Sequence, residues 1–454
     1  MWLENRGYLE ARPQSGFYIR TPSARLIPEP QFDAHPSKPA ALGNNAILAG
    51  IMEAAADPAN VPFGAGCISP ELFPNRKLNL ILRQIVRQRP LHSANYDFPP
   101  GVEALRHQIA RRALAAGCRV SPRDVVVTSG AQATNLSLRA VTRPGDVIAV
   151  ESPTYFGILE SAASLALKVL EISTHPQGGM DLDELEQAIK KHSVKACVIM
   201  ANCHNPLGYV LPDSHKQAVV ELTARRNVAV IEDDLYGDLA FADPRPLTAK
   251  SFDRKGLVLL CSSASKALSP GYRIGWVFAG RFQPEVERLK LITSMAAPSL
   301  PQWVVAEFLS SGGYDRHLNR LRANLAGQVE MLRRTAFQCF PKGRRISRPA
   351  GGHMLWIELP AKIEAMKLWR AALSEHISIL PGPIFSVPGV TRTTFGSMRE
   401  SRPRTPATAL WQLWDASAHT ARRFGPEGGR SLGTLQRAIL LLAMEPSSGG
   451  CLRK

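Results

Sequence analysis

Residues 262–276 read SSASKALSPGYRIGW and follow a strand that we predict at 257–261. The lysine of this stretch, Lys266, stands among small residues, which leave room for a bulky group on its amine. A lysine amine in a partly desolvated pocket has a lowered pKa and can condense with an aldehyde. Ser263 and Arg273 could both reach an anion beside it, the arginine by a two-pronged contact. A solvated lysine in a loop is the plain alternative for this pattern alone.

A lysine nucleophile next to an anion site is what pyridoxal 5′-phosphate requires. If Lys266 has this role, groups that hold the ring and the phosphate of the cofactor should follow other strands of the same sheet. The order of strands and helices along the chain therefore predicts where the groups that bind the ring and the phosphate lie.

Short apolar stretches alternate with helical segments between residues 93 and 279. The predicted strands lie at 125–127, 146–150, 167–172, 196–200, 228–231, 257–261 and 274–279. This alternation predicts an α/β fold with an open, mostly parallel sheet covered by helices on both faces. In such sheets the ligand lies at the carboxyl ends of the strands. After residue 291 we expect a long helix that leads to a smaller unit.

A candidate phosphate site follows the strand at 125–127. Gly130, Ala131 and Gln132 open a helix there. Free backbone N–H groups at the positive end of a helix suit a phosphate monoester. An ordinary turn between a strand and a helix is the alternative.

Candidate groups for a cofactor ring follow three other strands. Asp233 and Tyr236 come after 228–231, where a buried carboxylate would keep a ring nitrogen protonated and a phenol could bind a ring hydroxyl. Asn205, in NCHNPLG, can donate to the same oxygen, and Tyr155, in SPTY, could stack on a flat ring. Solvated loop acids and a plain loop aromatic are the alternatives. We interpret the neighbouring His204 as a bystander, because no partner has metal-ligand spacing.

Composition narrows the class of protein. The 454 residues are 45% hydrophobic, enough for a large core in two or more domains. A net charge of +17 permits a polyanionic partner, but the charge is spread out and is weak evidence for DNA. Seven cysteines without CxxC pairing favour free thiols in a reducing compartment over disulfides or a metal site. We find no membrane-length apolar run and no signal-peptide pattern, and therefore expect a cytoplasmic protein.

Five motifs together resemble a known family. SGAQ, PTYFG, NCHNPLG, EDDLY and SSASKALSPGYRIGW occur in the order found in fold-type I pyridoxal-phosphate enzymes of the class I/II aminotransferase group. The order and spacing hold from about Gly64 to Phe385. In front of them, GYLEARPQSGFYIR resembles the wing of a GntR-type winged helix. The combination is similar to the MocR-type regulators, a GntR branch with an aminotransferase-like effector domain.

The resemblance implies a role for each candidate residue. Lys266 would bind the cofactor covalently and move protons, Asp233 would pair with its ring nitrogen, Asn205 and Tyr236 would bind its ring oxygen, and Tyr155 would stack on the ring. The phosphate would be held by Gly130, Ala131, Gln132, Ser263 and Arg273, and by Tyr96 from a second subunit. Gly66 would lie near the substrate carboxylate. A homodimer and a small amino-group ligand or amino acid are the implied partners, with DNA only if a full winged helix lies upstream.

Composition, periodicity and the resemblance together divide the chain into five segments. They are a remnant of a winged-helix wing at 1–20, with a β-hairpin at 9–19, a linker at 21–60, a large cofactor-binding domain at 61–290, a small α+β domain at 291–389 and an atypical tail at 390–454. The periodicity ends near residue 390, and we interpret the tail as disordered or as the product of a frame shift near residue 388.

One departure from the family pattern bears on function. Gly396 occupies the position where the family has an arginine that clamps the substrate carboxylate, a two-pronged contact that few residues can replace. The residues assigned to the cofactor are present, so cofactor binding is expected. The missing arginine concerns substrate binding, so the sequence argues against turnover. Two functions remain open, an effector sensor in a transcriptional regulator and an active aminotransferase that exchanges amino groups between an amino acid and a 2-oxo acid.

Overall fold

The structure is a computed structural model that describes residues 9–12, 16–19, 27–30, 38–42, 46–130, 132–340, 342–360, 362–387 and 394–395. Ala131 and, apart from Thr394 and Phe395, the predicted tail at 390–454 lie outside the described residues. In the described part of the chain, no helix has the length and apolar character needed to cross a membrane.

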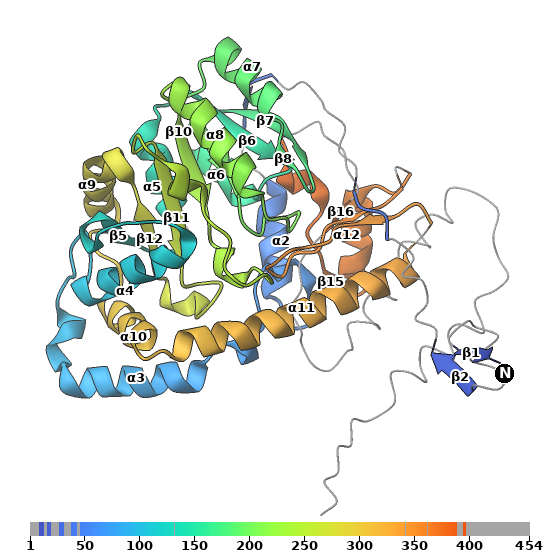
Figure 1. The fold of residues 1–454 in the computed structure, drawn as a ribbon, viewed down its shortest axis with the longest axis horizontal. Coiled ribbons are helices and arrows are strands. Elements are labelled where there is room, and N and C mark those ends of the chain that lie inside the picture. The colour runs from blue at the N-terminus through green and yellow to red at the C-terminus, as the bar shows by residue number, and fades with distance from the viewer. Residues whose placement is uncertain are drawn as a thin grey trace, which may run out of the picture.

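The α-helices and strands alternate along most of the described chain (Figure 1). The helices are α2 (Ala46–Ala56), α3 (Asn75–Gln88), α4 (Glu103–Ala113), α5 (Gln132–Val141), α6 (Phe156–Ser164), α7 (Leu182–His192), α8 (Asp213–Arg225), α9 (Gln283–Ser294), α10 (Ser299–Ser310), α11 (Gly313–Cys339) and α12 (Ala365–Ser374). The strands of the central sheet are β3 (Ala40–Ala41), β5 (Val125–Thr128), β6 (Val147–Ser152), β7 (Lys168–His175), β8 (Gly179–Met180), β9 (Ala196–Ile199), β10 (Ala229–Asp233), β11 (Val258–Ser263) and β12 (Gly275–Phe278). The remaining strands are β1 (Leu9–Arg12), β2 (Gly16–Ile19), β4 (Val61–Pro62), β13 (Arg345–Ile346), β14 (Ile357–Glu358), β15 (Ile377–Ser378) and β16 (Thr394–Phe395).

The central sheet has the mixed, mostly parallel topology that the sequence predicts. Its strands lie in the order β3-β7-β6-β9-β10-β11-β12-β5, and β8 pairs with β7. The five strands from β7 to β11 in this order are parallel, whereas β12 is antiparallel to both β11 and β5. All seven predicted strands are confirmed, with ends shifted by up to three residues.

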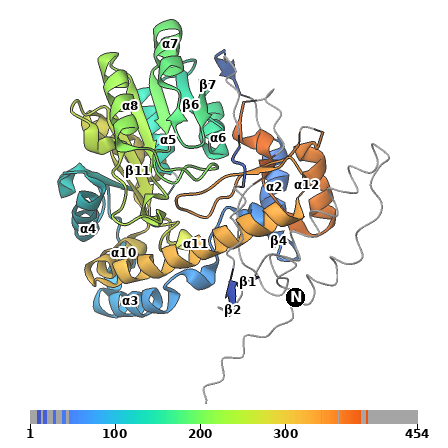
Figure 2. The same ribbon diagram turned by 45° about the vertical axis from the view of Figure 1, so that its right-hand side comes forward.

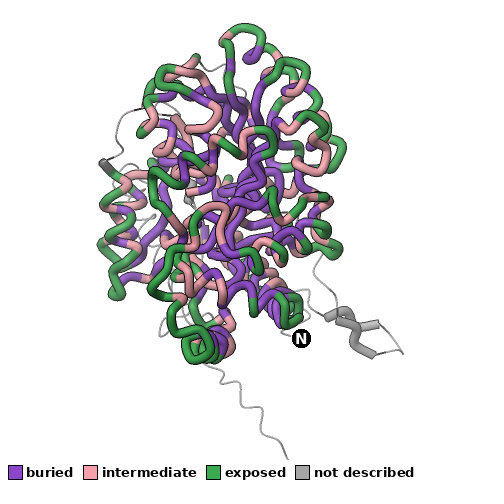
Figure 3. The backbone as a smooth tube through the Cα atoms, turned by 90° about the vertical axis from the view of Figure 1, so that its left-hand side faces the viewer, coloured by how far each residue is buried: buried purple, intermediate pink, exposed green. Residues whose placement is uncertain are grey.

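Alternating side chains of the central strands pack on opposite faces of the sheet. Ile148, Val198 and Leu259 belong to a core shared with α4, α5, α6 and α9. Their neighbours Ala149, Cys197 and Val258 belong to a second core shared with α7 and α8. Because both faces are covered, these strands are apolar at almost every position. The buried residues accordingly concentrate in the middle of the molecule (Figure 3).

A 27-residue helix, α11, connects this body to a smaller unit (Figure 2). Leu318, Leu321 and Leu325 of α11 pack in the first core, beside α10. Further along, Leu332 and Ala336 pack in a third core with β14, β15 and α12. At 1.5 Å per residue the helix is about 40 Å long, enough to pass through both cores. The predicted long helix therefore exists, but it begins at residue 313, after two shorter helices.

Two segments near the amino end bear on the sequence predictions. The predicted hairpin at 9–19 is confirmed, since β1 and β2 pair antiparallel with Leu9 opposite Ile19. The predicted linker at 21–60 differs from expectation: Ala40 and Ala41 extend the sheet beside β7, and 46–56 form α2. Its composition, rich in Pro, Ala and Ser, suggested a linker, but alanine is also the best helix former, and Ile51 of α2 packs in the second core.

We expect Ile51→Ala to lower the free energy of unfolding by about 2–4 kcal/mol, because Ile51 is 0% exposed in the second core and truncation leaves a cavity. Its neighbour Met52 is 39% exposed, so Met52→Ala should change stability by less than about 0.5 kcal/mol. Urea unfolding of both variants measures the difference. Equal, small effects would mean that α2 does not pack on the body of the protein.

Candidate cofactor site

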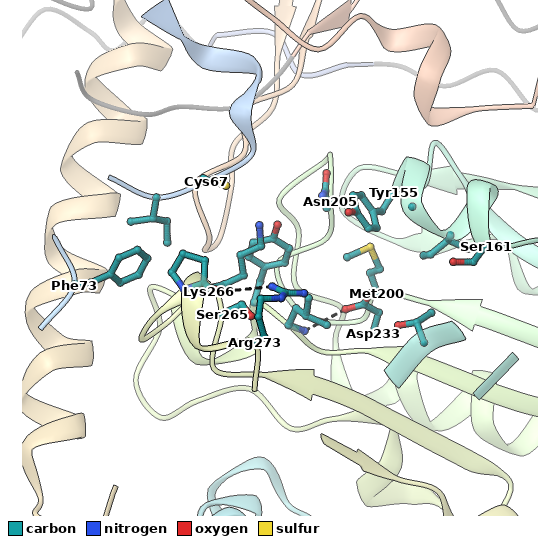
Figure 4. Close-up of a pocket in the computed structure, with 17 residues that line it drawn as sticks. Cys67, Phe73, Tyr155, Ser161, Met200, Asn205, Asp233, Ser265, Lys266 and Arg273 are labelled. Atoms are coloured by element: carbon teal, nitrogen blue, oxygen red, sulfur yellow. Dashed lines mark hydrogen bonds between the residues drawn. The ribbon is translucent and has the colours of Figure 1, made fainter. Parts of the chain in front are cut away.

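A cavity of about 260 Å³ opens at the carboxyl ends of the parallel strands. Six of the predicted site residues line it (Figure 4): Tyr155, Asn205, Asp233, Tyr236, Lys266 and Arg273. They come from loops and strand ends that lie far apart in the sequence. The cavity wall is completed by residues that the motifs did not single out, among them Cys67, Thr134 and Met200.

The register of three strands explains how the loops meet. Ser263, the last residue of β11, pairs with Gly275 of β12, and Gly275 pairs with Thr128, the last residue of β5. A Cβ at Gly275 would lie 2.7 Å from the carbonyl oxygen of Gly130, so these backbones approach too closely for any larger residue. The loops that carry Lys266, Arg273 and Gly130 therefore leave the sheet at one level.

Lys266 lies at the centre of this group and is half-buried. Its Nζ donates to the carbonyl oxygen of Gly66 at 2.7 Å and lies 5.6 Å from the centre of the Tyr236 ring. Gly66 has a φ of +58°, and nothing lies within 4 Å of the position that a Cβ would take. Next to the lysine, the carbonyl of Ala267 lies 2.7 Å from Nε2 of His317 in α11. The amine is thus held at an open space rather than in an ion pair with a described carboxylate.

Asp233 ends β10 and is 3% exposed. Burial raises the pKa of this carboxyl to about 7, and the charge of Asp234 adds to the rise. A hydrogen bond from the backbone N–H of Leu235, at 3.2 Å, and the charge of Lys266 act in the opposite direction. A group poised near neutral pH in a cavity can hold or release a proton at small cost.

Two phenols and an amide surround the remaining space. Tyr236 is 4% exposed; burial, together with the charge of Asp233, raises its pKa well above the usual value, while a side-chain hydrogen bond with Asn205 lowers it. Burial also raises the pKa of Tyr155 to about 12, so both phenols stay protonated at neutral pH. Asn205 is 4% exposed, and its Oδ1 has no hydrogen-bond partner among the described residues. A buried amide oxygen in this state is an available acceptor.

The predicted anion site lies where α5 begins. Gly130 has a φ of +57°, and a Cβ there would lie 2.7 Å from Nη2 of Arg273, so the guanidinium packs directly over the glycine. Oε1 of Gln132 accepts from the backbone N–H of Ser129 at 3.3 Å. Ser263 is buried, and its Oγ accepts from the backbone N–H of Ser265 at 3.3 Å. A guanidinium beside a helix amino end attracts a negatively charged group.

Other predicted residues lie outside the cavity wall. Gly66, Gly130 and Ser263 contact residues that line it, and Gln132 begins α5 two residues before Thr134 of the cavity wall. Tyr96 lies in a separate open pocket with Ser129 and residues 296–301. Tyr96 is 66% exposed, so it does not contribute to the cavity of its own chain.

Sequence reasoning missed a buried polar cluster behind Asn205. Glu151 is 0% exposed, accepts from the backbone N–H of Met200 at 2.7 Å and from the Tyr209 hydroxyl at 2.5 Å, and lies 3.3 Å from Nε2 of His204. His204, interpreted as a bystander, therefore links the loop that carries Asn205 to the buried Glu151. The signal was available: Glu151 is an acid within a buried strand, where charged residues occur only with partners.

A second missed residue is His353, which is 1% exposed. Its ring centre lies 5.6 Å from that of Tyr236. Burial lowers its pKa to about 3, helped by the charge of Lys266, so the imidazole is neutral. It lies on the glycine-rich turn 351–353 of the smaller unit, which no sequence pattern assigned to the site.

Comparison with known proteins identifies the family. The family described as aminotransferase class I and II matches residues 84–405. The uncharacterized HTH-type transcriptional regulator YdcR of Escherichia coli is 41% identical, over 85% of this chain and 82% of its own length. A second uncharacterized HTH-type transcriptional regulator of Escherichia coli, YjiR, is 35% identical over 86% of this chain and 83% of its own length.

Solved aminotransferases have the same fold. The crystal structure of LysN, an α-aminoadipate aminotransferase from Thermus thermophilus complexed with N-(5′-phosphopyridoxyl)-L-leucine, superposes with a TM-score of 0.77 at 24% identity, over 84% of this chain and 96% of that one. The chain therefore belongs to the aminotransferase class I and II family and has the fold-type I architecture. The predicted resemblance to helix-turn-helix regulators is confirmed as well.

We expect the stability of Asp233→Asn relative to the parent to rise by on the order of 3 kcal/mol between pH 5 and pH 8, without cofactor. The native pKa of about 7 exceeds the usual 3.8, so between these values the folded state binds more protons than the unfolded state. The parent therefore loses stability as the pH rises through this window, and asparagine does not titrate. Urea unfolding at both pH values measures this. A difference independent of pH would mean that the carboxyl is solvated.

Proposed function

We propose that this member of the aminotransferase class I and II family is a pyridoxal-phosphate-binding effector domain of a MocR-type transcriptional regulator. One observation carries the cofactor assignment: a single cavity is lined by the amine of Lys266, the buried carboxyl of Asp233 and the guanidinium of Arg273. An amine, an acid poised near neutral pH and an anion site are the three groups that a phosphorylated pyridine aldehyde needs.

The unsatisfied atoms of the site support this fit. Oδ1 of Asn205 and Oγ of Ser265 are buried without a hydrogen-bond partner in the described structure. Native proteins leave few such groups, and in a cavity a polar ligand or a water molecule can satisfy them. A Cβ at Gly130 would fill the space under Arg273. Of these features, the space at Gly130 lies where the resemblance expects the phosphate of the cofactor.

The residues of the chain would divide the work as follows. When bound, the cofactor supplies an aldehyde carbon and a ring that withdraws electrons. Lys266 would bind that carbon through Nζ and move a proton there, and Asp233 would hold a proton at the ring nitrogen. Asn205 and Tyr236 would bind the ring oxygen, and Tyr155 would cover one face of the ring. Gly130, Gln132, Ser263 and Arg273, with Ala131 outside the described residues, would hold the phosphate.

A homodimer follows from the same proposal. Tyr96 is mostly exposed and lies in a pocket apart from its own cavity, as expected for a residue that completes the site of a partner. Leu91 and Phe98, which flank Tyr96 in the sequence, have exposed apolar side chains. The side chains of Leu291, Ile292 and Met295 at the end of α9 are exposed as well. Exposed apolar groups in such numbers favour a protein interface.

The relatives that are transcriptional regulators favour a sensor over an enzyme. Gly396 favours it too, because it occupies the position of the expected carboxylate-binding arginine. Gly396 lies outside the described residues. The ligand sensed would be the cofactor itself or an amino-group compound. An active aminotransferase is the second candidate, because Lys266, Asp233 and Asn205 are all present and 2-aminoadipate transaminase of Thermus thermophilus is 28% identical over 74% of this chain and 84% of its own length.

We expect pyridoxal phosphate to give the purified chain a visible absorption band that Lys266→Ala lacks, because the C=N bond formed with the lysine absorbs at longer wavelength than the free aldehyde. Lys191→Ala, which removes an exposed lysine on α7, is the matched control and should keep the band. A folded parent without the band, or a folded Lys266→Ala variant that retains it, would contradict the assignment.

A second experiment separates sensor from enzyme. Amino acids titrated into the loaded protein should shift the band without release of a 2-oxo acid, because the carboxylate-clamping arginine is missing. Absorption reports binding, and a coupled assay reports the 2-oxo acid. Stoichiometric release of 2-oxo acid in the parent, absent in Lys266→Ala, would establish the aminotransferase instead.

A further inference from the structure

Lys290 is a buried cation that the proposed site does not use. It lies on α9, is 1% exposed, and is among the largest fully buried side chains of the described chain. Its Nζ donates to Oγ of Ser294 at 2.6 Å, and it forms no ion pair with another described residue. Burial lowers the pKa of this amine to about 8, so it remains mostly charged at neutral pH. Burying a charge without an opposite charge costs several kcal/mol.

A comparison with Lys216 shows that this state is unusual within the chain. Lys216, on α8, is buried to the same extent, but its Nζ donates to the carbonyl oxygen of Leu247 at 2.7 Å and lies 3.2 Å from the carboxylate of Asp213. That lysine has its compensating charge within the chain. Lys290 has only a neutral hydroxyl.

Hydrogen bonds connect Lys290 to the start of α5. Oγ of Ser294 accepts from Nε2 of Gln132 at 3.1 Å, and Oε1 of Gln132 accepts from the backbone N–H of Ser129 at 3.3 Å. The helices α9 and α5 are in contact, and these hydrogen bonds link the ammonium through Ser294 to Gln132, the first residue of α5. A buried cation close to the positive end of a helix is unfavourable by itself. Arg273 over Gly130 adds a further positive charge to the same place.

An anion at the amino end of α5 would compensate all three positive features at once. We propose that Lys290 is a positioning residue for a phosphate monoester bound there, acting through Ser294 and Gln132, and that it makes the site select phosphorylated over unphosphorylated pyridine aldehydes. This inference rests on the proposed function, since it assigns the phosphate of that cofactor to this place. A phosphate monoester carries close to two negative charges at neutral pH, so the removal of a nearby cation affects it strongly.

The test compares how tightly the parent and Lys290→Gln bind pyridoxal phosphate and pyridoxal. The intensity of the visible band measures the binding of each aldehyde. Glutamine can still donate to Ser294, so the variant removes the charge and keeps the hydrogen bond. We expect the affinity for pyridoxal phosphate to fall about tenfold, which corresponds to about 1.4 kcal/mol, and that for pyridoxal to change less than about twofold. Arg288→Gln, on the exposed side of the same helix, removes the same charge and should change neither.

Two outcomes would overturn the inference: equal weakening of both aldehydes, which indicates a packing role, and no change in either. If Lys290→Gln does not fold, Ser294→Ala replaces it in the test. Loss of Oγ of Ser294 should also reduce the preference for the phosphorylated aldehyde, and an unchanged preference would reject the role of Lys290.

If the parent binds neither aldehyde, the proposed function has failed. Inorganic phosphate then tests Lys290 separately: it should raise the thermal unfolding midpoint of the parent more than that of Lys290→Gln, and equal shifts would reject the role.

Discussion

The pairing of one antiparallel strand holds the site together. β12 lies between β11 and β5, and its first residue, Gly275, is opposite both Ser263 and Thr128. These two residues end the strands that precede Lys266 and Gly130, and Arg273 comes two residues before Gly275. A slip of one residue in either pairing would turn every side chain of β12 to the other face of the sheet. The amine and the anion site therefore keep their relative position because the ladder of hydrogen bonds keeps its register.

The carboxylates at the end of β10 illustrate how one sequence places three adjacent acids in three environments. Glu232 accepts from the backbone N–H groups of Ala249 and Lys250, and Asp234 pairs with Arg245. Asp233, between them, faces the cavity with one backbone hydrogen bond. Strand alternation sends neighbouring side chains to opposite faces, so the flanking acids make structural contacts and the middle carboxyl faces the cavity.

Much of this arrangement could be predicted from the sequence, and the reasons are local. Apolar strands such as Val125–Thr128 and Ala196–Ile199 are marked by composition, and residues that directly follow them lie at one sheet edge in any fold of this class. Lys266, Asp233 and Asn205 were placed at this edge in this way, and they line one cavity together with Arg273, which precedes a strand instead. The packing of α2, the Glu151 cluster and His353 were not, because they depend on contacts between segments far apart in sequence. Tyr96 and Lys290 differ again: the role proposed for Tyr96 needs a second chain, and the role proposed for Lys290 depends on the lack of a described carboxylate beside its buried amine.

The helix α11 has a mechanical consequence. Its first half packs in the core of the large body, its second half packs in the core of the smaller unit, and His317 bonds to the carbonyl beside Lys266. A helix of this length behaves as a stiff lever. A tilt of the smaller unit would move α11, and through His317 it would move the backbone next to Lys266. The position of the Lys266 backbone and the orientation of the smaller unit would thus be coupled through one helix.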